Sequence, residues 1–134
     1  MRIQNKHNLL YEEESYKIRG ACFDVWKVFG GAFKERAIDK ALTKSLAKRG
    51  LKVEEQKRIN IYFENEKVGT YVPDKIVNDS IILEVKVKPF LTRQDTDQFW
   101  KYLKGSQYKL GFLINFGLKL TIKRIVYDTA RYQR

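Results

Sequence analysis

The segment Pro73–Lys86 reads PDKIVNDSIILEVK, and it decides the fold. Two runs rich in β-branched residues flank residues 78–80, Asn-Asp-Ser, which are typical of a turn. We therefore predict a β-hairpin. A connection of three residues pairs Asp74 with Glu84 and puts both carboxylates on one face of the sheet. A connection of two residues would turn Glu84 to the other face, so the chemistry depends on the longer one.

The second strand of this hairpin carries charge within an apolar run. Glu84 and Lys86 are two residues apart and share one face of the strand. Leu83, Val85 and Val87 share the other face and are expected to pack in the core. Charged side chains in an interior strand are costly to bury without partners, so the face with Glu84 and Lys86 requires an explanation.

A metal site explains these charges. Two carboxylates that face each other repel when both are ionised, and a bound divalent cation relieves the repulsion. Oxygen ligands with water completing the shell suit Mg²⁺ or Mn²⁺ better than Zn²⁺. We predict that Asp74 and Glu84 bind such an ion and that Lys86 orients a water or stabilises negative charge. The alternative is a structural cluster of the three charges on a solvated face.

Two helices offer further candidates. Glu35 lies three residues before Ile38 and seven before Leu42, so it points along an apolar stripe towards the sheet and is a candidate ligand. It is equally an acid favoured by a helix N-terminus. Gln98 and Tyr102 are four residues apart on one helix face, where they can bind a phosphate or a metal-bound water. Tyr102 is also consistent with ordinary core.

Hydrophobic periodicity assigns the remaining chain to an α/β fold in one domain, residues 1–134. Ser15 and the pair Thr92–Asp95 are predicted to cap helices, and Gly105 to end one. A helix between two strands implies a right-handed crossover and a parallel pair within a mixed sheet. We expect helices at 15–29, 32–48 and 92–104, and strands at 52–64, 67–77, 81–87, 108–116 and 119–127.

The charge balance favours an anionic partner. Lys and Arg outnumber Asp and Glu by 27 to 16, a formal net charge of +11, and nucleic acid is the first candidate. A Lys-rich solvated surface is the plainer reading. The side chains that we expect to contact the phosphate backbone are Lys101, Lys104, Lys123 and Arg124.

Single residues exclude several kinds of chemistry. Cys22 is the only cysteine and His7 the only histidine, so an intramolecular disulfide, a Cys-based metal site and a Ser–His–Asp triad are not expected. No apolar run approaches the roughly 20 residues of a membrane span, and we expect a cytoplasmic protein.

The segment quoted above resembles the PD-(D/E)xK nuclease signature, with Asp74 as its first acid and Glu84-x-Lys86 as its second part. Other segments resemble the branch of that superfamily named after its GxxExxY motif. The resemblance extends from about residue 15 to residue 127. The segments that carry it are QFWKYLK (98–104), GFLINFG (111–117) and KRIV (123–126).

This resemblance implies a restriction-endonuclease-like αβββαβ core, in which helices flank a mixed central sheet, with an extra N-terminal helix and a C-terminal strand. It also implies Mg²⁺- or Mn²⁺-dependent cleavage of nucleic acid, with DNA favoured over RNA and the Val85 carbonyl as a further ligand. Of the naming motif only the acid, Glu35, is present, because Ala32 and Ile38 replace its Gly and Tyr.

Two other functions remain open on sequence alone. One is a nucleic-acid-binding module with an idle site, which would bind without metal-dependent cleavage. The other is an interaction subunit, whose exposed aromatic residues bind a protein partner or a second copy of the chain in a salt-insensitive way.

Overall fold

The computed structural model describes residues 10–127, so His7 and the tail after Tyr127 lie outside the described residues. No helix within this range is long and apolar enough to cross a membrane. The elements, in chain order, are α1 (Glu12–Phe29), α2 (Glu35–Lys48), β1 (Val53–Glu55), β2 (Ile59–Phe63), β3 (Glu66–Tyr71), β4 (Lys75–Val77), β5 (Ile81–Lys86), α3 (Arg93–Ser106), β6 (Leu110–Phe116) and β7 (Leu120–Val126).

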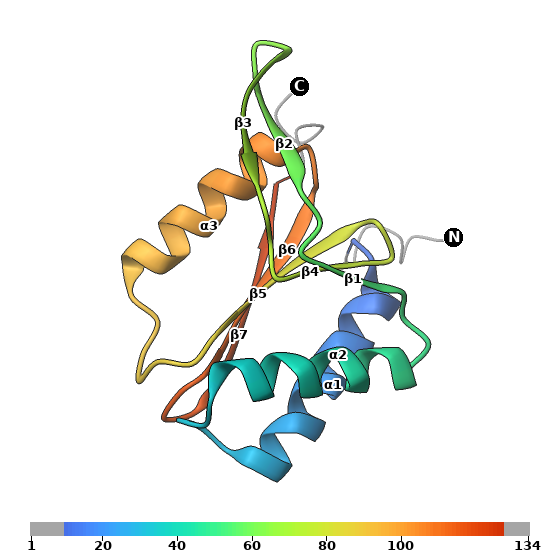
Figure 1. Cartoon of the computed structure of the whole chain (residues 1–134), viewed down its shortest axis with the longest axis vertical. Helices are drawn as coiled ribbons and strands as arrows, with labels where there is room; N and C mark the ends of the chain where they lie inside the picture. The colour runs from blue at the N-terminus through green and yellow to red at the C-terminus, as the bar shows by residue number, and fades with distance from the viewer. Residues whose placement is uncertain (1–9, 128–134) are drawn as a thin grey trace, which may run out of the picture.

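A five-stranded sheet in the order β1-β4-β5-β6-β7 forms the centre of the molecule. β5 and β6 are parallel, and the other neighbouring strands are antiparallel. α3 makes the crossover between the parallel pair (Figure 1). The series α2-β1-β4-β5-α3-β6 is the predicted αβββαβ core, with α1 and β7 added at its ends. The predicted mixed α/β fold is therefore confirmed.

Strand alternation sends alternate side chains to two separate hydrophobic clusters. Leu83 and Val85 pack with α1 and α2, and Val87 adjoins the same cluster, as predicted. Ile76 and Ile82 point the other way and pack with α3. Glu84 and Lys86 follow Ile82 in parity, so they lie on the α3 face of the sheet.

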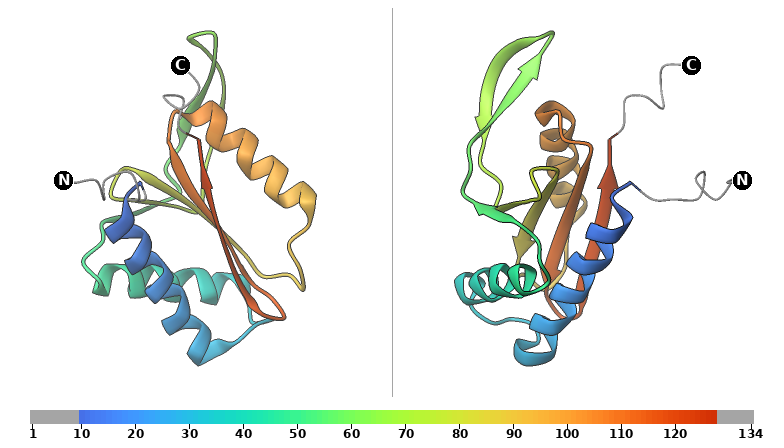
Figure 2. Two further views of the ribbon diagram at one scale, coloured as in Figure 1. Left: turned by 180° about the vertical axis from the view of Figure 1, so that it is seen from behind. Right: turned by 90° about the vertical axis from the view of Figure 1, so that its right-hand side faces the viewer.

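Two predicted strands were wrong, because each one splits between two sheets. The segment 52–64 becomes β1 and β2, separated by a break at Gln56, whose φ is 56°. The segment 67–77 becomes β3 and β4, separated by residues 72–74, where Pro73 has no N–H to continue a ladder. β2 and β3 pair with each other and project from the main sheet as a separate hairpin (Figures 1 and 2).

The helix ends confirm one predicted cap and correct another. Thr92 and Asp95 form the predicted capping box, in which each side chain accepts from the backbone N–H of the other residue. Ser15 does not cap α1, which begins at Glu12. Its hydroxyl instead donates to the Tyr11 carbonyl at 2.8 Å, within the first turn.

Three other boundaries differ from the prediction because residues other than glycine adopt positive φ. α3 runs past Gly105 to Ser106, and Gln107, with φ of 72°, caps its C-terminus. α2 starts at Glu35 rather than at Ala32, whose φ of 59° is not helical. The turn of the projecting hairpin lies at residues 64–65, one position earlier than predicted.

One ion cluster connects α2 to the edge of the sheet. The Lys75 side chain on β4 is fully buried, and its ammonium donates to the side chain and carbonyl of Asp39 on α2. It also lies 3.6 Å from Glu55 on β1, which in turn accepts from the Thr43 hydroxyl at 2.6 Å. A buried ammonium is tolerated here because it is paired.

We expect Lys75→Ala to lower the free energy of unfolding by about 3 kcal/mol, because it removes a buried stem and leaves two acids without their cation. Urea unfolding measures the change. The control is Lys40→Ala, an exposed lysine on α2, the helix that carries Asp39. Equal small losses, under roughly 0.5 kcal/mol, in both variants would contradict the structural role of the cluster.

Candidate functional site

Asp74 and Glu84 hold each other through the backbone. The backbone N–H of Asp74 donates to Glu84 Oε1 at 2.9 Å, and the backbone N–H of Val85 donates to Asp74 Oδ2 at 2.7 Å. The register pairs Lys75 with Leu83, so the next residues outward are Asp74 and Glu84. This is the predicted register, set by the predicted connection of three residues, 78–80.

Local sequence explains why this pair forms where β4 begins. Pro73 cannot donate to a ladder, so β4 starts only at Lys75, and Asp74 remains outside the regular pairing. The Asp74 N–H is therefore free to bond a side chain. Glu84 supplies that acceptor, and the two residues become one compact acidic unit.

Burial and mutual repulsion perturb both acids. Burial raises the pKa of Glu84 to about 7, and the charge of Asp74 adds to this. Burial also raises the pKa of Asp74, and the Asp39 carboxylate raises it further, against the Val85 N–H, which lowers it. Lys86 lowers both pKa values, so its ammonium lies close enough to act on the pair.

Glu84 opens into a pocket of about 340 Å³ between the end of β3 and α3. Lys86, Gln98 and Tyr102 also line it, so the structure brings these three predicted residues together with Glu84. Tyr71, which the sequence analysis did not single out, lines the opposite wall. Its ring stacks on that of Tyr102, with centroids 4.1 Å apart and planes 3° apart.

The pocket contains a second acid that is already neutralised. Asp95 lines it, but its carboxylate accepts from the Lys88 ammonium at 2.8 Å and from the Thr92 backbone. Although burial opposes the effect, these hydrogen bonds lower the pKa of Asp95 to about 2. Of the two acids that line this pocket, Asp95 is paired with a cation. Glu84 forms no ion pair within residues 10–127.

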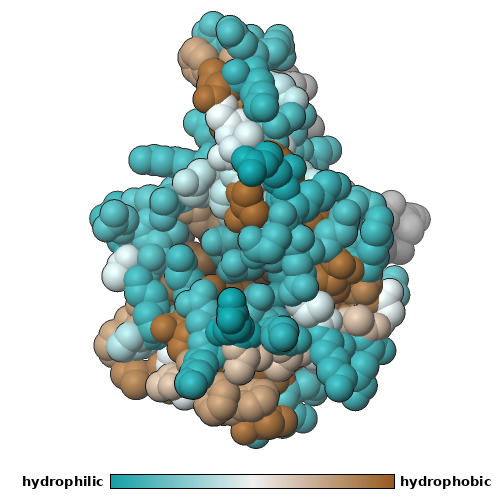
Figure 3. Space-filling model, in the orientation of Figure 1, coloured by the Kyte–Doolittle hydropathy of each residue, from teal (hydrophilic) through white to brown (hydrophobic). Residues whose placement is uncertain are grey.

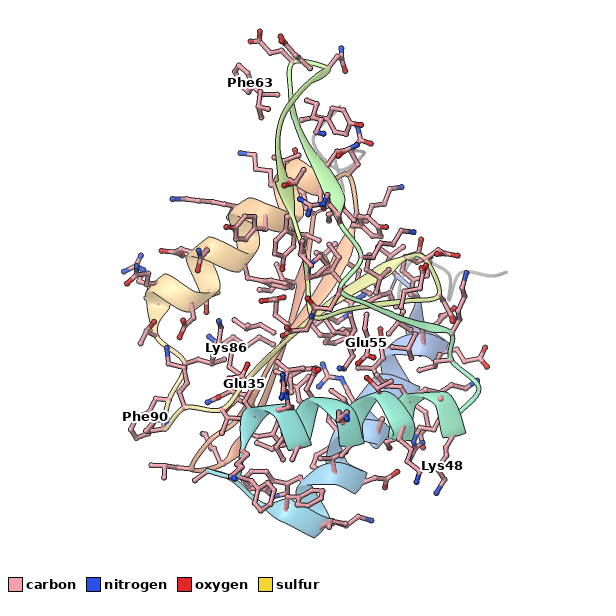
Figure 4. The ribbon with its side chains drawn as sticks, viewed as in Figure 1. Glu35, Lys48, Glu55, Phe63, Lys86 and Phe90 are labelled. Atoms are coloured by element: carbon pink, nitrogen blue, oxygen red, sulfur yellow. The ribbon has the colours of Figure 1, made fainter. Side chains whose placement is uncertain are left out.

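Glu35 is not joined to the pair. It is exposed at the first turn of α2, and Figure 4 labels it there and Lys86 on β5. No group of three His, Cys, Asp or Glu within the described range has the spacing to hold a metal ion. The α2 acid that acts on Asp74 is Asp39, one turn later, and it is bound to Lys75.

The four predicted phosphate-binding cations lie in different places. Lys101 lines a cavity of about 630 Å³ that adjoins the pocket through Gln98 and Tyr102. Lys123 lies 3.5 Å from the Thr96 hydroxyl of α3. Lys104 lines a separate cavity with the projecting hairpin, and Arg124 donates to the Leu10 carbonyl on the opposite face of the sheet.

Sequence reasoning missed Tyr71 because it treated residues 67–77 as one straight strand. The break at residues 72–74 separates β3 from β4, and Tyr71, at the end of β3, lines the pocket with Glu84. Pro73, one residue before Asp74, was the available signal, since a proline inside a predicted strand argues for a break.

The model of the PD-(D/E)XK nuclease superfamily matches residues 12–125. The chain belongs to this superfamily. No curated protein sequence matches the chain. Among solved structures, an alkaline exonuclease from Laribacter hongkongensis is similar, with 14% identity and a TM-score of 0.46. The match covers 67% of this chain, which spans about half (54%) of that protein.

PD-(D/E)XK nucleases generally use divalent metals such as Mg²⁺, and the acidic pair of this chain fits such an ion. One oxygen of each carboxylate accepts a hydrogen bond from a backbone N–H, which fixes the direction of both side chains. Two adjacent acids with raised pKa values are stabilised as carboxylates by a cation. Hard oxygen donors of this kind suit Mg²⁺ and Mn²⁺.

The raised pKa of Glu84 predicts how stability depends on pH in the metal-free protein. The ordinary pKa of a glutamate is 4.5, whereas in the folded state Glu84 keeps its proton up to about pH 7. The contribution to stability is complete below 4.5 and is lost as pH rises through 7. Glu84→Gln retains the acceptor oxygen and removes the ionisation. Its free energy of unfolding should therefore rise relative to wild type by roughly 2 kcal/mol between pH 4.5 and 7.

Urea unfolding in chelator at several pH values measures this difference. Glu66→Gln, an exposed glutamate on the projecting hairpin, is the matched control and should follow wild type throughout. Parallel curves for wild type and Glu84→Gln would show that Glu84 ionises normally.

Proposed function

We propose that this protein is a metal-dependent nuclease that hydrolyses phosphodiester bonds. The observation that supports this most is the acidic pair Asp74–Glu84, whose Glu84 lines one pocket with Lys86, Gln98 and Tyr102. Membership of the superfamily gives the class of reaction. The finer assignment to its GxxExxY branch is part of the same proposal.

Asp74 and Glu84, with the Val85 carbonyl, would hold Mg²⁺ or Mn²⁺. When bound, such an ion activates a water and neutralises charge on the phosphate. We leave Glu35 out of the ligand set because it is exposed and belongs to no group of three candidate ligands among the described residues. Lys86 stabilises negative charge at the reacting phosphate, and Gln98 and Tyr102 bind the strand.

The substrate is nucleic acid, and we propose DNA in a cytoplasmic setting. The net charge of +11 supports an extended phosphate contact. The face in Figure 3 is largely hydrophilic, with apolar patches gathered towards its lower end. Of the four predicted cations, Lys101 is the one whose cavity shares Gln98 and Tyr102 with the pocket. A second copy of the chain remains a candidate partner.

Cleavage should require Mg²⁺ or Mn²⁺ and stop with a chelator. Asp74→Asn and Glu84→Gln should each abolish cleavage, because they remove ligand charge with little change of shape. Lys86→Ala should lower the rate roughly 10²-fold, as for the loss of one preorganised stabiliser, and leave metal affinity near wild type. The cleavage rate is measured by turnover of labelled single- and double-stranded DNA and RNA. The metal affinity is measured by calorimetric titration with Mn²⁺.

Circular dichroism and urea unfolding serve as folding controls for these variants. Cleavage at the wild-type rate in Asp74→Asn would place the activity elsewhere. A folded wild type that binds nucleic acid and cleaves none of these substrates with either metal would support the alternative, a binding module with an idle site.

Binding should weaken steeply with salt. Each phosphate that the protein neutralises on duplex DNA contributes a log–log slope of about −0.9, and we expect roughly four to six such contacts. Fluorescence anisotropy in chelator over a salt series measures the slope. Lys101→Gln should make the log–log slope about one unit less steep, because one phosphate contact is lost. Lys48→Gln, on α2, should leave the slope unchanged. A flat salt dependence would favour a protein-interaction role instead.

A further inference from the structure

Tyr71 has a feature that the proposed chemistry has not used. Its side chain is only 8% exposed, and its hydroxyl is a buried polar atom without a hydrogen-bond partner in the described structure. Buried hydroxyls are almost always paired, because an unpaired one forfeits its bonds to water. This one lines the pocket that contains Glu84 and Lys86.

We propose that Tyr71 is a substrate-binding residue whose hydroxyl donates a hydrogen bond to a phosphate oxygen of the nucleic-acid strand in the pocket. The ligand rests on the proposed function, since a phosphodiester is the substrate that the site is expected to take. The residue itself belongs to no motif in the sequence, and only the departure of β3 from the main sheet brings it to the pocket.

The stack on Tyr102 fixes the direction of the hydroxyl. The two rings are parallel at 4.1 Å, so the Tyr71 ring cannot rotate freely about its long axis or tilt away. Tyr102 comes from α3 and Tyr71 from β3, and the stack therefore joins the two walls of the pocket. A hydroxyl held in this way meets a ligand without further ordering of the side chain.

Tyr71 can act as a donor, because a phenol is protonated at neutral pH and carries one O–H. The Tyr71 hydroxyl lies close enough to the Glu84 carboxylate to interact with it, but Glu84 Oε1 accepts from the Asp74 N–H at 2.9 Å and no hydrogen bond of normal geometry joins the two side chains. Lys86 and Gln98 supply further donors in the same pocket, which together favour a ligand rich in acceptor oxygens.

Tyr71→Phe tests the proposal because it keeps the ring and the stack and removes only the hydroxyl. The kcat/KM for DNA cleavage with Mg²⁺ should fall roughly tenfold to a hundredfold, as for one hydrogen bond to a charged group. Binding of a fluorescein-labelled single-stranded oligothymidylate in chelator should weaken about tenfold. The Tm should stay the same or rise, because an unpaired buried hydroxyl has been removed.

Tyr16→Phe is the matched control: the same change at a tyrosine 75% exposed on α1, which should alter neither readout. Wild-type kcat/KM and affinity in Tyr71→Phe would overturn the proposal, and so would a lower Tm with unchanged affinity. A wild type that binds the oligonucleotide through Tyr71 but never cleaves keeps this proposal and rejects the nuclease. A wild type that neither binds nor cleaves rejects both.

Discussion

The reciprocal hydrogen bonds between Asp74 and the Glu84 segment constrain the rest of the structure. One bond runs from the Asp74 N–H to Glu84 and the other from the Val85 N–H back to Asp74, so the two strands meet at a single register. A shift of one residue would turn Glu84 and Lys86 into the cluster against α1 and α2. The hydrophobic face of β5, with Leu83 and Val85 in that cluster, therefore fixes the same register that the acids require.

This arrangement has an energetic cost, which is visible in the raised pKa values of both acids. The fold tolerates this cost because the two hydrophobic clusters lie on either side of β5. Sites that must bind a cation commonly hold their ligands close together at such a cost. The unpaired hydroxyl of Tyr71 in the same pocket is a second, smaller cost of the same kind.

The sequence predicted the elements whose pattern is complete over a short distance. Alternation along β5, the three-residue connection at 78–80 and the Thr92–Asp95 capping box each depend on neighbouring residues, and all three are confirmed. The projecting hairpin was missed, because its residues 59–71 alternate as any strand does and nothing local says which sheet they join. Asp39 and Lys75 were missed for a related reason: their pairing joins residues 36 positions apart.

The two lysines of the β4–β5 hairpin show how strand parity divides charge between structure and function. Lys75 points to the α2 side, where it is fully buried and bound to Asp39 and Glu55. Lys86 points to the α3 side, half-buried in the pocket, and forms no ion pair with residues 10–127. An ammonium already bound to two carboxylates has little charge left to offer a phosphate, whereas an unpaired one beside an acidic pair retains it. The same hairpin thus supplies one lysine that stabilises the fold and another that remains available for an anionic substrate.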